Sequence, residues 1–339
     1  MKRRGLCVFT AGLVLAFAVL GFGSSTQAEP LEVRSARVPL YANNPGERRA
    51  GSLVYRGGLV LTSDARAFGG WSDLAVSADG AEILAVSDDA HWLRARLSYD
   101  SNGDLSGLNA AEIAPMLDPQ GRPMAGKDGD AEGLTLERPN DVHGPAAVSF
   151  ERNPRVWRYD LSRGLDARPA DVPIGAWVRS LRPNRQLEAI TLVRPGTLLL
   201  FAETKLGAAD DILGAMESYP GARTTPATRM LSVVPRDPFA VTSAANAPDG
   251  GIYLLERRIS IAGGVGMELR HVPPNEIRAG ARLNGEVLAN LSFQDANIDN
   301  MEGLAVRRGA RGETLLYMIS DDNYSPLQRT LLLLFEVRN

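Results

Sequence analysis

Acidic side chains recur at two places in a pattern that repeats along this chain. Glu132, Glu188 and Glu302 each open a short apolar run, and Ser72 and Thr242 hold the same place in two further copies. A second acid closes the next apolar run of every copy, at Asp88, Glu151, Glu203, Glu256 and Asp321. Carboxylates held close together must be protonated, paired with cations or bound to a metal ion. Their chemistry therefore depends on whether the fold brings them together.

The repeating unit is a short strand, a Gly-containing turn and a second strand that ends in an acid. Its copies include WSDLAVSADGAEILAVSDD at 71–89 and MEGLAVRRGARGETLLYMISDD at 301–322. The opening polar residues are 60, 56, 54 and 60 positions apart, a period near 57. Segments rich in β-branched and aromatic residues lie between the copies and bring each unit to about four strands. Repeated four-stranded units with few helical patterns predict an all-β fold, a β-propeller.

The count of copies predicts five four-stranded blades, or six if a degenerate blade lies within residues 205–240. The last copy supplies only three strands, and residues 53–62 (LVYRGGLVLT) can supply the fourth. The ring would then close by pairing N- and C-terminal strands in one blade, which removes open sheet edges. We predict a single propeller domain over 53–339, preceded by an N-terminal extension at 29–52. Two β-sandwich domains are the alternative, but they give no reason for a fivefold repeat.

Residues 1–28 have the three-part build of a secretory signal peptide. A Lys2-Arg3-Arg4 start precedes an apolar run from Leu6 to Phe22, and small residues lead to an exit at Ala28. A retained membrane anchor is the alternative, but the apolar run is shorter than the ~20 residues of a typical span. We expect cleavage near Ala28 and a periplasmic or secreted protein without a membrane span. Sec and twin-arginine export both remain open.

Composition narrows the partners of the exported chain. Removing the three basic residues of the leader leaves 34 of the 37 Lys and Arg, against 40 Asp and Glu. The resulting net charge near −6 disfavours nucleic acid and anionic membranes as partners. The only cysteine, Cys7, lies in the leader, so the mature chain can form no disulfide. We expect a monomer that acts on a small molecule.

The innermost strand of each blade lines the axial channel, so the opening acids should converge at one channel mouth. Ca²⁺ takes six to eight oxygen ligands in irregular geometry, which suits carboxylates and amides. Zinc is disfavoured because thiolates are absent and the three histidines lack HExxH spacing. Alternatively, most of the second acid column is structural and is neutralised by Arg152, Lys205, Arg257 or Arg258. The candidate ligands for Ca²⁺ are Glu132, Glu188, Glu302, Asp88, Asp321 and Asn300.

The chemistry that these residues favour is metal-assisted hydrolysis of a phosphoester or carboxyl ester. No G-x-S-x-G elbow, Walker loop or dinucleotide fingerprint is present. Candidate catalytic groups are Glu132, Glu302 and His91, although His91 could equally be a packing residue beside Trp92. Candidate substrate-binding cations are Arg257, Arg258 and Lys205. The competing hypothesis is a non-catalytic propeller that binds a small ligand or an envelope partner.

Several motifs resemble a known family. They are RGGLVLTS at 56–63, DAEGLTL at 130–136 and NMEGLAV…ISDDNYSPLQRTLLLLF within 300–335. The chain resembles, from about Arg56 to Val337, the exported bacterial family described as phytase-like or esterase-like. That resemblance implies a β-propeller with recurrent Glu and Asp, ester or phosphoester hydrolysis, and calcium. Thr242 and Ser243 depart from the acidic pattern. Residues 205–229, too long for a tight turn, are expected to form a short helix or lid.

Overall fold

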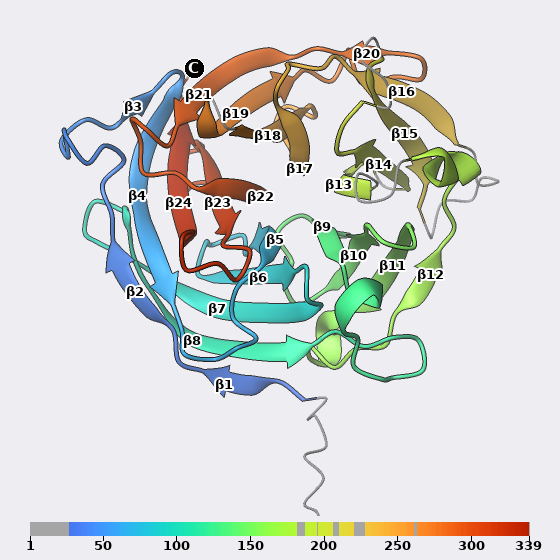
Figure 1. Cartoon of the computed structure of the whole chain (residues 1–339), viewed down its shortest axis with the longest axis horizontal. Helices are drawn as coiled ribbons and strands as arrows, with labels where there is room; N and C mark the ends of the chain where they lie inside the picture. Colours follow the sequence, from blue (N-terminus) through green and yellow to red (C-terminus); the bar gives the residue numbers. More distant parts are fainter. Residues whose placement is uncertain are drawn as a thin grey trace, which may run out of the picture.

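The strands form five sheets arranged as blades around a central axis (Figure 1). The computed structural model describes residues 27–181, 187–194, 196–205, 210–219, 228–260 and 263–338. In this part of the chain, helical structure is limited to three short 3₁₀ turns: η1 (Gly126–Asp128), η2 (Leu161–Arg163) and η3 (Ala176–Ser180). The all-β propeller prediction is confirmed, with five blades and not six. Most of the expected signal peptide, residues 1–26, lies outside the described residues.

Each blade has four antiparallel strands counted outward from the axis. The first blade contains β5 (Trp71–Val76), β6 (Glu82–Ser87), β7 (His91–Tyr99) and β8 (Leu105–Pro115). The second contains β9 (Ala131–Leu136), β10 (Pro145–Phe150), β11 (Arg155–Asp160) and β12 (Ala170–Val172). The third contains β13 (Leu187–Arg194), β14 (Thr197–Ala202), β15 (Ile212–Ser218) and β16 (Arg229–Val233), with β20 (Arg282–Leu283) added in parallel at its outer edge.

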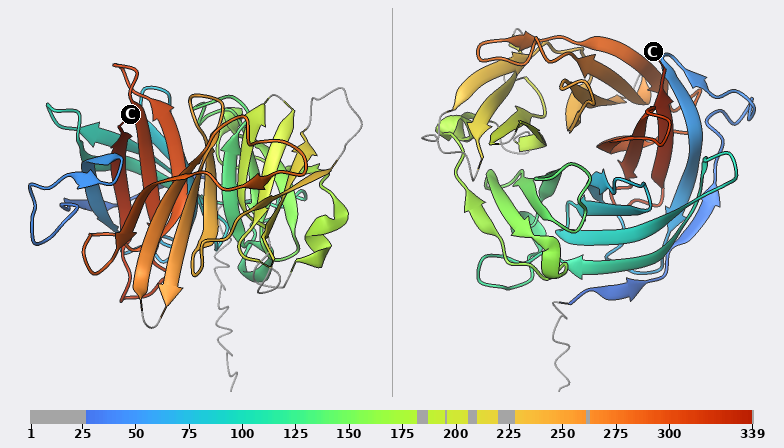
Figure 2. Two further views of the ribbon diagram at one scale, coloured as in Figure 1. Left: turned by 90° about the horizontal axis from the view of Figure 1, so that it is seen from above. Right: turned by 180° about the vertical axis from the view of Figure 1, so that it is seen from behind.

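The last two blades complete the ring. The fourth contains β17 (Ala240–Asn246), β18 (Ile252–Ser260), β19 (Gly264–Val272) and β21 (Glu286–Ser292). The fifth contains β22 (Asn300–Arg308), β23 (Thr314–Asp321), β24 (Thr330–Val337) and β4 (Leu53–Thr62). Strand β4 pairs antiparallel with β24, so one sheet joins segments from the two halves of the chain. The side view shows the blades standing around the axis (Figure 2).

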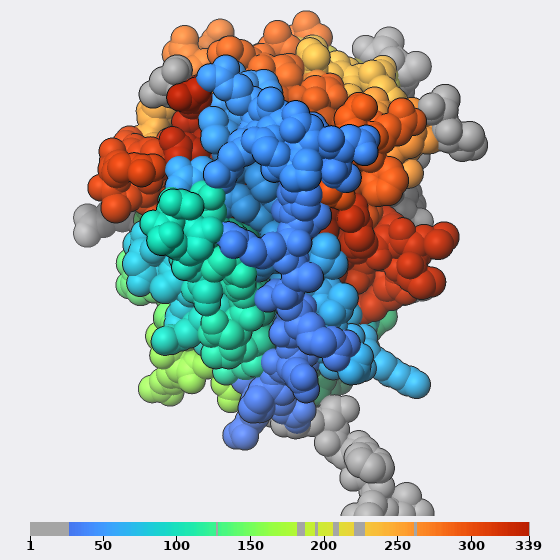
Figure 3. Space-filling model, turned by 90° about the vertical axis from the view of Figure 1, so that its left-hand side faces the viewer, coloured from blue at the N-terminus to red at the C-terminus, as the bar shows by residue number. Residues whose placement is uncertain are grey.

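The segment at 29–52 lies against the outside of the ring. β1 (Glu29–Leu31) pairs with β8 of the first blade, while β2 (Arg34–Arg37) and β3 (Arg49–Ala50) pair with β4 of the fifth. In the space-filling view this segment covers the outer strands where those blades meet (Figure 3). The extension therefore spans the seam between the first and fifth blades.

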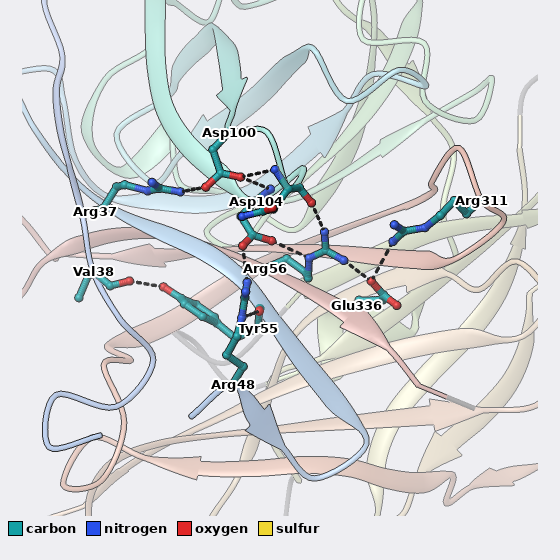
Figure 4. A network of polar contacts seen from close by, with 10 residues as sticks. Arg37, Val38, Arg48, Tyr55, Arg56, Asp100, Asp104, Arg311 and Glu336 are labelled. Atoms are coloured by element: carbon teal, nitrogen blue, oxygen red, sulfur yellow. Dashed lines mark hydrogen bonds and ion pairs between the residues drawn. The ribbon is translucent and has the colours of Figure 1, made fainter. Parts of the chain in front are cut away.

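A polar network crosses the same seam (Figure 4). Arg56 on β4 pairs through Nε with Asp104 at 2.7 Å and through Nη1 with Glu336 on β24 at 2.6 Å. Arg48 also reaches Asp104, at 2.6 Å. We call this set the closure network: Arg37, Arg48, Arg56 and Arg311 with Asp100, Asp104 and Glu336. Each of its carboxylates has an arginine partner, so the network joins the blades with little net charge.

Hydrophobic contact between neighbouring blades supplies the core. The buried apolar residues form clusters that each draw on adjacent blades. Every residue of β5 is buried, which is expected for a strand packed on both faces. No helix within the described ranges is long and apolar enough to cross a membrane.

The described part of the segment at 205–229 does not form the short helix that we predicted. Its described part contains β15 (Ile212–Ser218), which is the third strand of its blade and pairs with β14 and β16. Five of the seven residues of β15 are buried, as expected for a strand packed within a sheet. Residues 206–209 and 220–227 lie outside the described residues. The segment was misjudged because a blade whose strands are separated by a long connection gives a weak local pattern.

Candidate metal centre and active site

One β-bulge recurs in all five blades at the residue that opens each repeat. In β5, Trp71 pairs with Ser87 and Asp73 pairs with Val86, so Ser72 has no partner across the ladder. The equivalent residues are skipped in the other innermost strands: Glu132, Glu188, Thr242 and Glu302. A bulge bends its strand and re-aims the side chain. The residue that opens each repeat in the sequence is therefore a bulge residue, and the five bulges lie at the same end of the channel.

Three of the bulge residues are glutamates, and they converge. Carboxylate oxygens of Glu132, Glu188 and Glu302 lie within 4.8 Å of one another. We call these three residues the axial triad and the channel end that they line the acid mouth. Glu188 and Glu302 are buried, and Glu132 is half-buried. Burial, together with the neighbouring carboxylates Glu188 and Glu302, raises the pKa of Glu132 well above its ordinary value. The structure therefore brings together the residues that the sequence pattern selected.

One position of the second acid column holds an arginine instead of an acid, and aligning the repeats by sequence did not reveal it. Val241 pairs with Glu256, in the register that pairs Trp71 with Ser87 and Met301 with Ser320. Asp88 and Asp321 each follow that residue, so the structural equivalent on β18 is Arg257. The column reads Asp88, Glu151, Glu203, Arg257 and Asp321. Assigning Glu256 to it was wrong by one residue, and a shift of one residue turns a strand side chain to the opposite face.

Glu256 on that opposite face makes a buried ion pair within its own blade. Arg270 on β19 donates from Nε and Nη2 to the two carboxylate oxygens at 2.5 and 2.6 Å. Both side chains are fully buried. This bidentate pair satisfies the charge locally, so Glu256 has a structural role and does not belong to the acid mouth.

Arg257 lies inside the carboxylate cluster. Its Nη1 is 3.2 Å from Glu302 and its Nη2 is 3.1 Å from Glu203 and 4.0 Å from Glu188. Burial alone would lower the pKa of this guanidinium, but Glu302, Glu188 and Glu203 raise it above its ordinary value. Arg257 is therefore an internal counter-ion of the acids, which agrees with the structural alternative for the second acid column. It also lies at the acid mouth.

The three remaining predicted ligands border Glu302. Asn300 donates from Nδ2 to Glu302 at 2.7 Å and to Asp321 at 3.4 Å, and its Oδ1 accepts from Arg257. Burial and then Glu302 raise the pKa of Asp88 to about 7 and that of Asp321 to about 8. The buried Oδ1 of Asp88 has no hydrogen-bond partner in the described part of the chain. A buried carboxylate oxygen without a partner lowers the free energy of unfolding unless a cation or a proton binds to it.

Further acids enlarge the cluster. Asp130 and Glu151 have carboxylate oxygens within 4.8 Å of Glu132, and Glu151 and Glu203 have the same relation to Glu188. Arg152 lies 2.8 Å from Asp130 and offsets part of this charge. Glu151 and Glu203 belong to the second acid column of the sequence but were not among the predicted ligands. Asp130 was not predicted either, and its signal was its spacing of two residues before Glu132.

Asp73 was also not predicted as a functional residue. It follows the bulge residue Ser72 and lies next to the acid mouth, where it bonds several innermost strands. Its carboxylate accepts hydrogen bonds from the backbone N–H groups of Leu74, Leu134 and Leu304 at 2.8–3.1 Å, and from Ser243 Oγ at 3.0 Å. These donors come from four innermost strands. Burial raises the pKa of Asp73 to about 7, although the four hydrogen bonds oppose this by favouring the charged form. The other strands carry Gly133, Ala189, Ser243 and Gly303 at this level, and their small side chains leave room for one carboxylate.

Three predicted residues make their polar contacts away from the axial triad. His91 begins β7, and no hydrogen bond or ion pair among the described residues joins it to the axial triad. Burial lowers its pKa. Arg258 donates to the backbone of Gly263 and stacks 5.4 Å from the centre of the Phe239 ring. Lys205 pairs with Asp237. Of the predicted substrate-binding cations, only Arg257 lies within the cluster.

The residues present fit a hard divalent cation. The cluster supplies only oxygen donors, from carboxylates and the Asn300 amide, and Ca²⁺ prefers that set. Several carboxylates have raised pKa values, and the Asp88 oxygen lacks a partner. Arg257 and Arg152 offset only part of the charge of eight neighbouring acids: Asp88, Asp130, Glu132, Glu151, Glu188, Glu203, Glu302 and Asp321.

A five-bladed propeller with a carboxylate cluster at one channel mouth is the class of protein that fold and site define. A family model described as phytase-like, esterase-like activity of phytase, matches residues 66–324. That range is more than half of the chain, and the chain therefore belongs to this family. The resemblance stated from the sequence motifs is confirmed.

Other comparisons add little about function. No curated protein matches the chain. A solved structure provisionally described as a gluconolactonase is 13% identical with a TM-score of 0.44, and the alignment covers 94% of both chains. The tail fibre of Staphylococcus aureus phage P68 is 11% identical with a TM-score of 0.43 over 84% of this chain and 52% of that one. U3-55K is 9% identical with a TM-score of 0.36 over 80% and 96%.

Proposed function

We propose that this protein is an exported, Ca²⁺-dependent hydrolase that acts on a phosphoester or carboxyl ester at the acid mouth. The observation that carries the proposal is the axial triad, in which three glutamates from three blades approach within 4.8 Å. Like charges at that separation repel by about 3 kcal/mol per pair at an effective dielectric near 20. A binding role explains why the fold tolerates this repulsion.

Glu132, Glu188 and Glu302 would hold the cation, with Asp88, Asp321 and Asn300 as further oxygen donors around Glu302. When bound, Ca²⁺ would polarise an ester oxygen and lower the pKa of a bound water. Membership of the phytase-like family supports hydrolysis as the reaction class. The expectation of a monomer in the periplasm or outside the cell belongs to the same proposal.

The chain itself would handle protons and orientation. A carboxylate of the cluster that is left off the cation would carry the proton in the reaction. In the ion-free protein, burial and neighbouring carboxylates raise the pKa of Glu132 well above its ordinary value and that of Asp88 to about 7, so whichever of the two does not bind the cation is suited to exchange a proton. Arg257 keeps Glu188, Glu203 and Glu302 in place and would attract an anionic substrate oxygen. These assignments favour the cluster acids over His91 as proton carriers.

The test uses purified chain beginning after Ala28. Metal content is measured by elemental analysis, and a panel of phosphate and carboxylate esters is assayed with EDTA and with restored Ca²⁺. We expect turnover that EDTA abolishes and Ca²⁺ restores, and loss of both turnover and bound Ca²⁺ in Glu132→Gln, Glu188→Gln and Glu302→Gln. Glu286→Gln makes the same chemical change at an exposed glutamate outside the cluster, so its metal content should stay unchanged.

Two results separate the alternatives. Bound Ca²⁺ without turnover of any ester would favour the non-catalytic binding propeller. Unchanged metal content in all three triad variants, with normal circular dichroism, would remove these residues as ligands.

A further inference from the structure

A second cavity lies on the same axis at the end opposite the acid mouth. It has a volume of about 390 Å³, which is in the range of small-molecule sites. All five innermost strands contribute to it through their later residues, including Leu74–Val76, Leu134–Leu136 and Leu304–Arg308. These follow the bulge residues by two to six positions, or roughly 7–20 Å along a strand. We call this cavity the far pocket.

Asp73 lies between the far pocket and the acid mouth, one residue after the bulge residue Ser72 and one before the lining residue Leu74. Asp73 accepts hydrogen bonds from Leu74, Leu134 and Leu304, three residues of the pocket wall, and so ties the floor together. Asn140 donates from Nδ2 to the carbonyls of Val76 and Val306 at 3.0 and 2.9 Å. Asp73 and Asn140 thus form hydrogen bonds with backbone N–H and C=O groups at the edges of the innermost strands, which would otherwise face the channel unpaired. The interior that remains is largely apolar.

The charge of the far pocket is opposite to that of the acid mouth. No Asp or Glu is among its lining residues, all of which lie in the described part of the chain. Its charged residues are Arg307 and Arg308. Arg307 is engaged, because its Nε donates to the Tyr317 hydroxyl at 2.9 Å.

Arg308 is the free charge at the rim. Its side chain is exposed, and its Nη2 donates to the carbonyl of Pro248, another lining residue, at 3.2 Å. No ion pair involving Arg308 occurs among the described residues, in contrast to the arginines of the closure network. A guanidinium has five N–H donors, so Arg308 retains donors for a ligand.

We propose that the far pocket binds a small amphiphilic carboxylate. The apolar part of the ligand would enter the cavity, and its carboxylate would pair with Arg308 at the rim. Burial of apolar area supplies the affinity, and the charge pair supplies discrimination against cations. This site requires no metal and is independent of hydrolysis at the acid mouth.

Octanoate and octylammonium, which have the same chain length and opposite charge, test the proposal by titration calorimetry in EDTA. We expect octanoate to bind at least tenfold more tightly than octylammonium. Arg308→Gln should weaken octanoate binding about tenfold and leave octylammonium binding unchanged or stronger. Arg278→Gln, an exposed arginine outside the pocket, is the matched control and should bind octanoate normally.

Val306→Trp narrows the cavity and should abolish octanoate binding in protein with normal circular dichroism. Glu302→Gln should bind octanoate as the unchanged protein does, so failure of the hydrolase hypothesis leaves this result intact. Equal affinity for the two probes, or octanoate binding that survives both Arg308→Gln and Val306→Trp, would overturn the proposal.

Discussion

The acid mouth and the closure network are both rich in charge, yet they are built on opposite principles. In the closure network every carboxylate has an arginine partner, and Asp104 has two. In the acid mouth eight carboxylates share Arg257 and Arg152, and a buried oxygen of Asp88 has no partner. A balanced network can stabilise the fold by itself. An unbalanced one costs stability until something binds, which is the reason to assign function there.

The largest expected effect is a loss of turnover when a carboxylate of the acid mouth is removed and none when a carboxylate of the closure network is removed. Glu302→Gln should reduce Ca²⁺-dependent ester turnover at least about a hundredfold. The reason is that Glu302, a proposed Ca²⁺ ligand next to Asp88 and Asp321, loses its charge. Steady-state turnover at saturating Ca²⁺ measures this. Asp104→Asn changes a carboxylate of the closure network in the same way and should leave turnover of the folded protein unchanged. Equal losses in both variants would mean that the two regions do not differ as described.

Ca²⁺ itself should act on one region only. At about one hundred times its dissociation constant, it should add about 2.7 kcal/mol to the free energy of unfolding at pH 8. Thermal melts with EDTA and with Ca²⁺ provide the measurement, and an increase in Tm of about 5 °C is expected. The triad variants should lose this increase, and Asp104→Asn should retain it. A melt that is insensitive to Ca²⁺ would contradict the proposed site.

Stability without Ca²⁺ should respond to charge removal with opposite signs. Asp104→Ala should lower the free energy of unfolding by about 1–3 kcal/mol, because Arg48 and Arg56 lose a partly buried partner. Glu188→Gln removes a repelling charge and should leave stability unchanged or raise it, despite its contact with Arg257. Urea denaturation in EDTA compares the two. Strong destabilisation by Glu188→Gln would show that Arg257 already balances the acid mouth.

The smallest expected effect is a pH dependence of the Ca²⁺-free protein. The folded pKa values of Asp88 and Asp321, about 7 and about 8, lie above the ordinary value of 3.8. Each group therefore contributes most below its unfolded pKa, and that contribution is lost as pH rises through the folded pKa. Stability should therefore fall as pH rises from 5 to 8.5. Chemical denaturation across this window measures it, and saturating Ca²⁺ should suppress the fall.

Much of the architecture could be predicted because the repeat is local. Five copies of one hairpin signature imply five similar sheets, and the short last copy implies that residues 53–62 complete a blade. The axial triad followed from the same reasoning, since equivalent residues of a ring lie at equivalent heights. The third blade was harder to recognise at 205–229, because its third strand, β15, lies between connections of 9 and 10 residues that separate it from the hairpin signature.

The amino-acid sequence alone determined the period, the blades and the convergence of Glu132, Glu188 and Glu302, because similar segments adopt similar local structure. Only the tertiary structure decided that Arg257, and not Glu256, faces those acids, because the pairing of β17 with β18 sets the register and adjacent residues of a strand point to opposite faces. It alone also decided that Asp73 bonds four strands at once, since those donors come from residues as far apart as 74 and 304. Contacts across a closed ring are not encoded in any single segment.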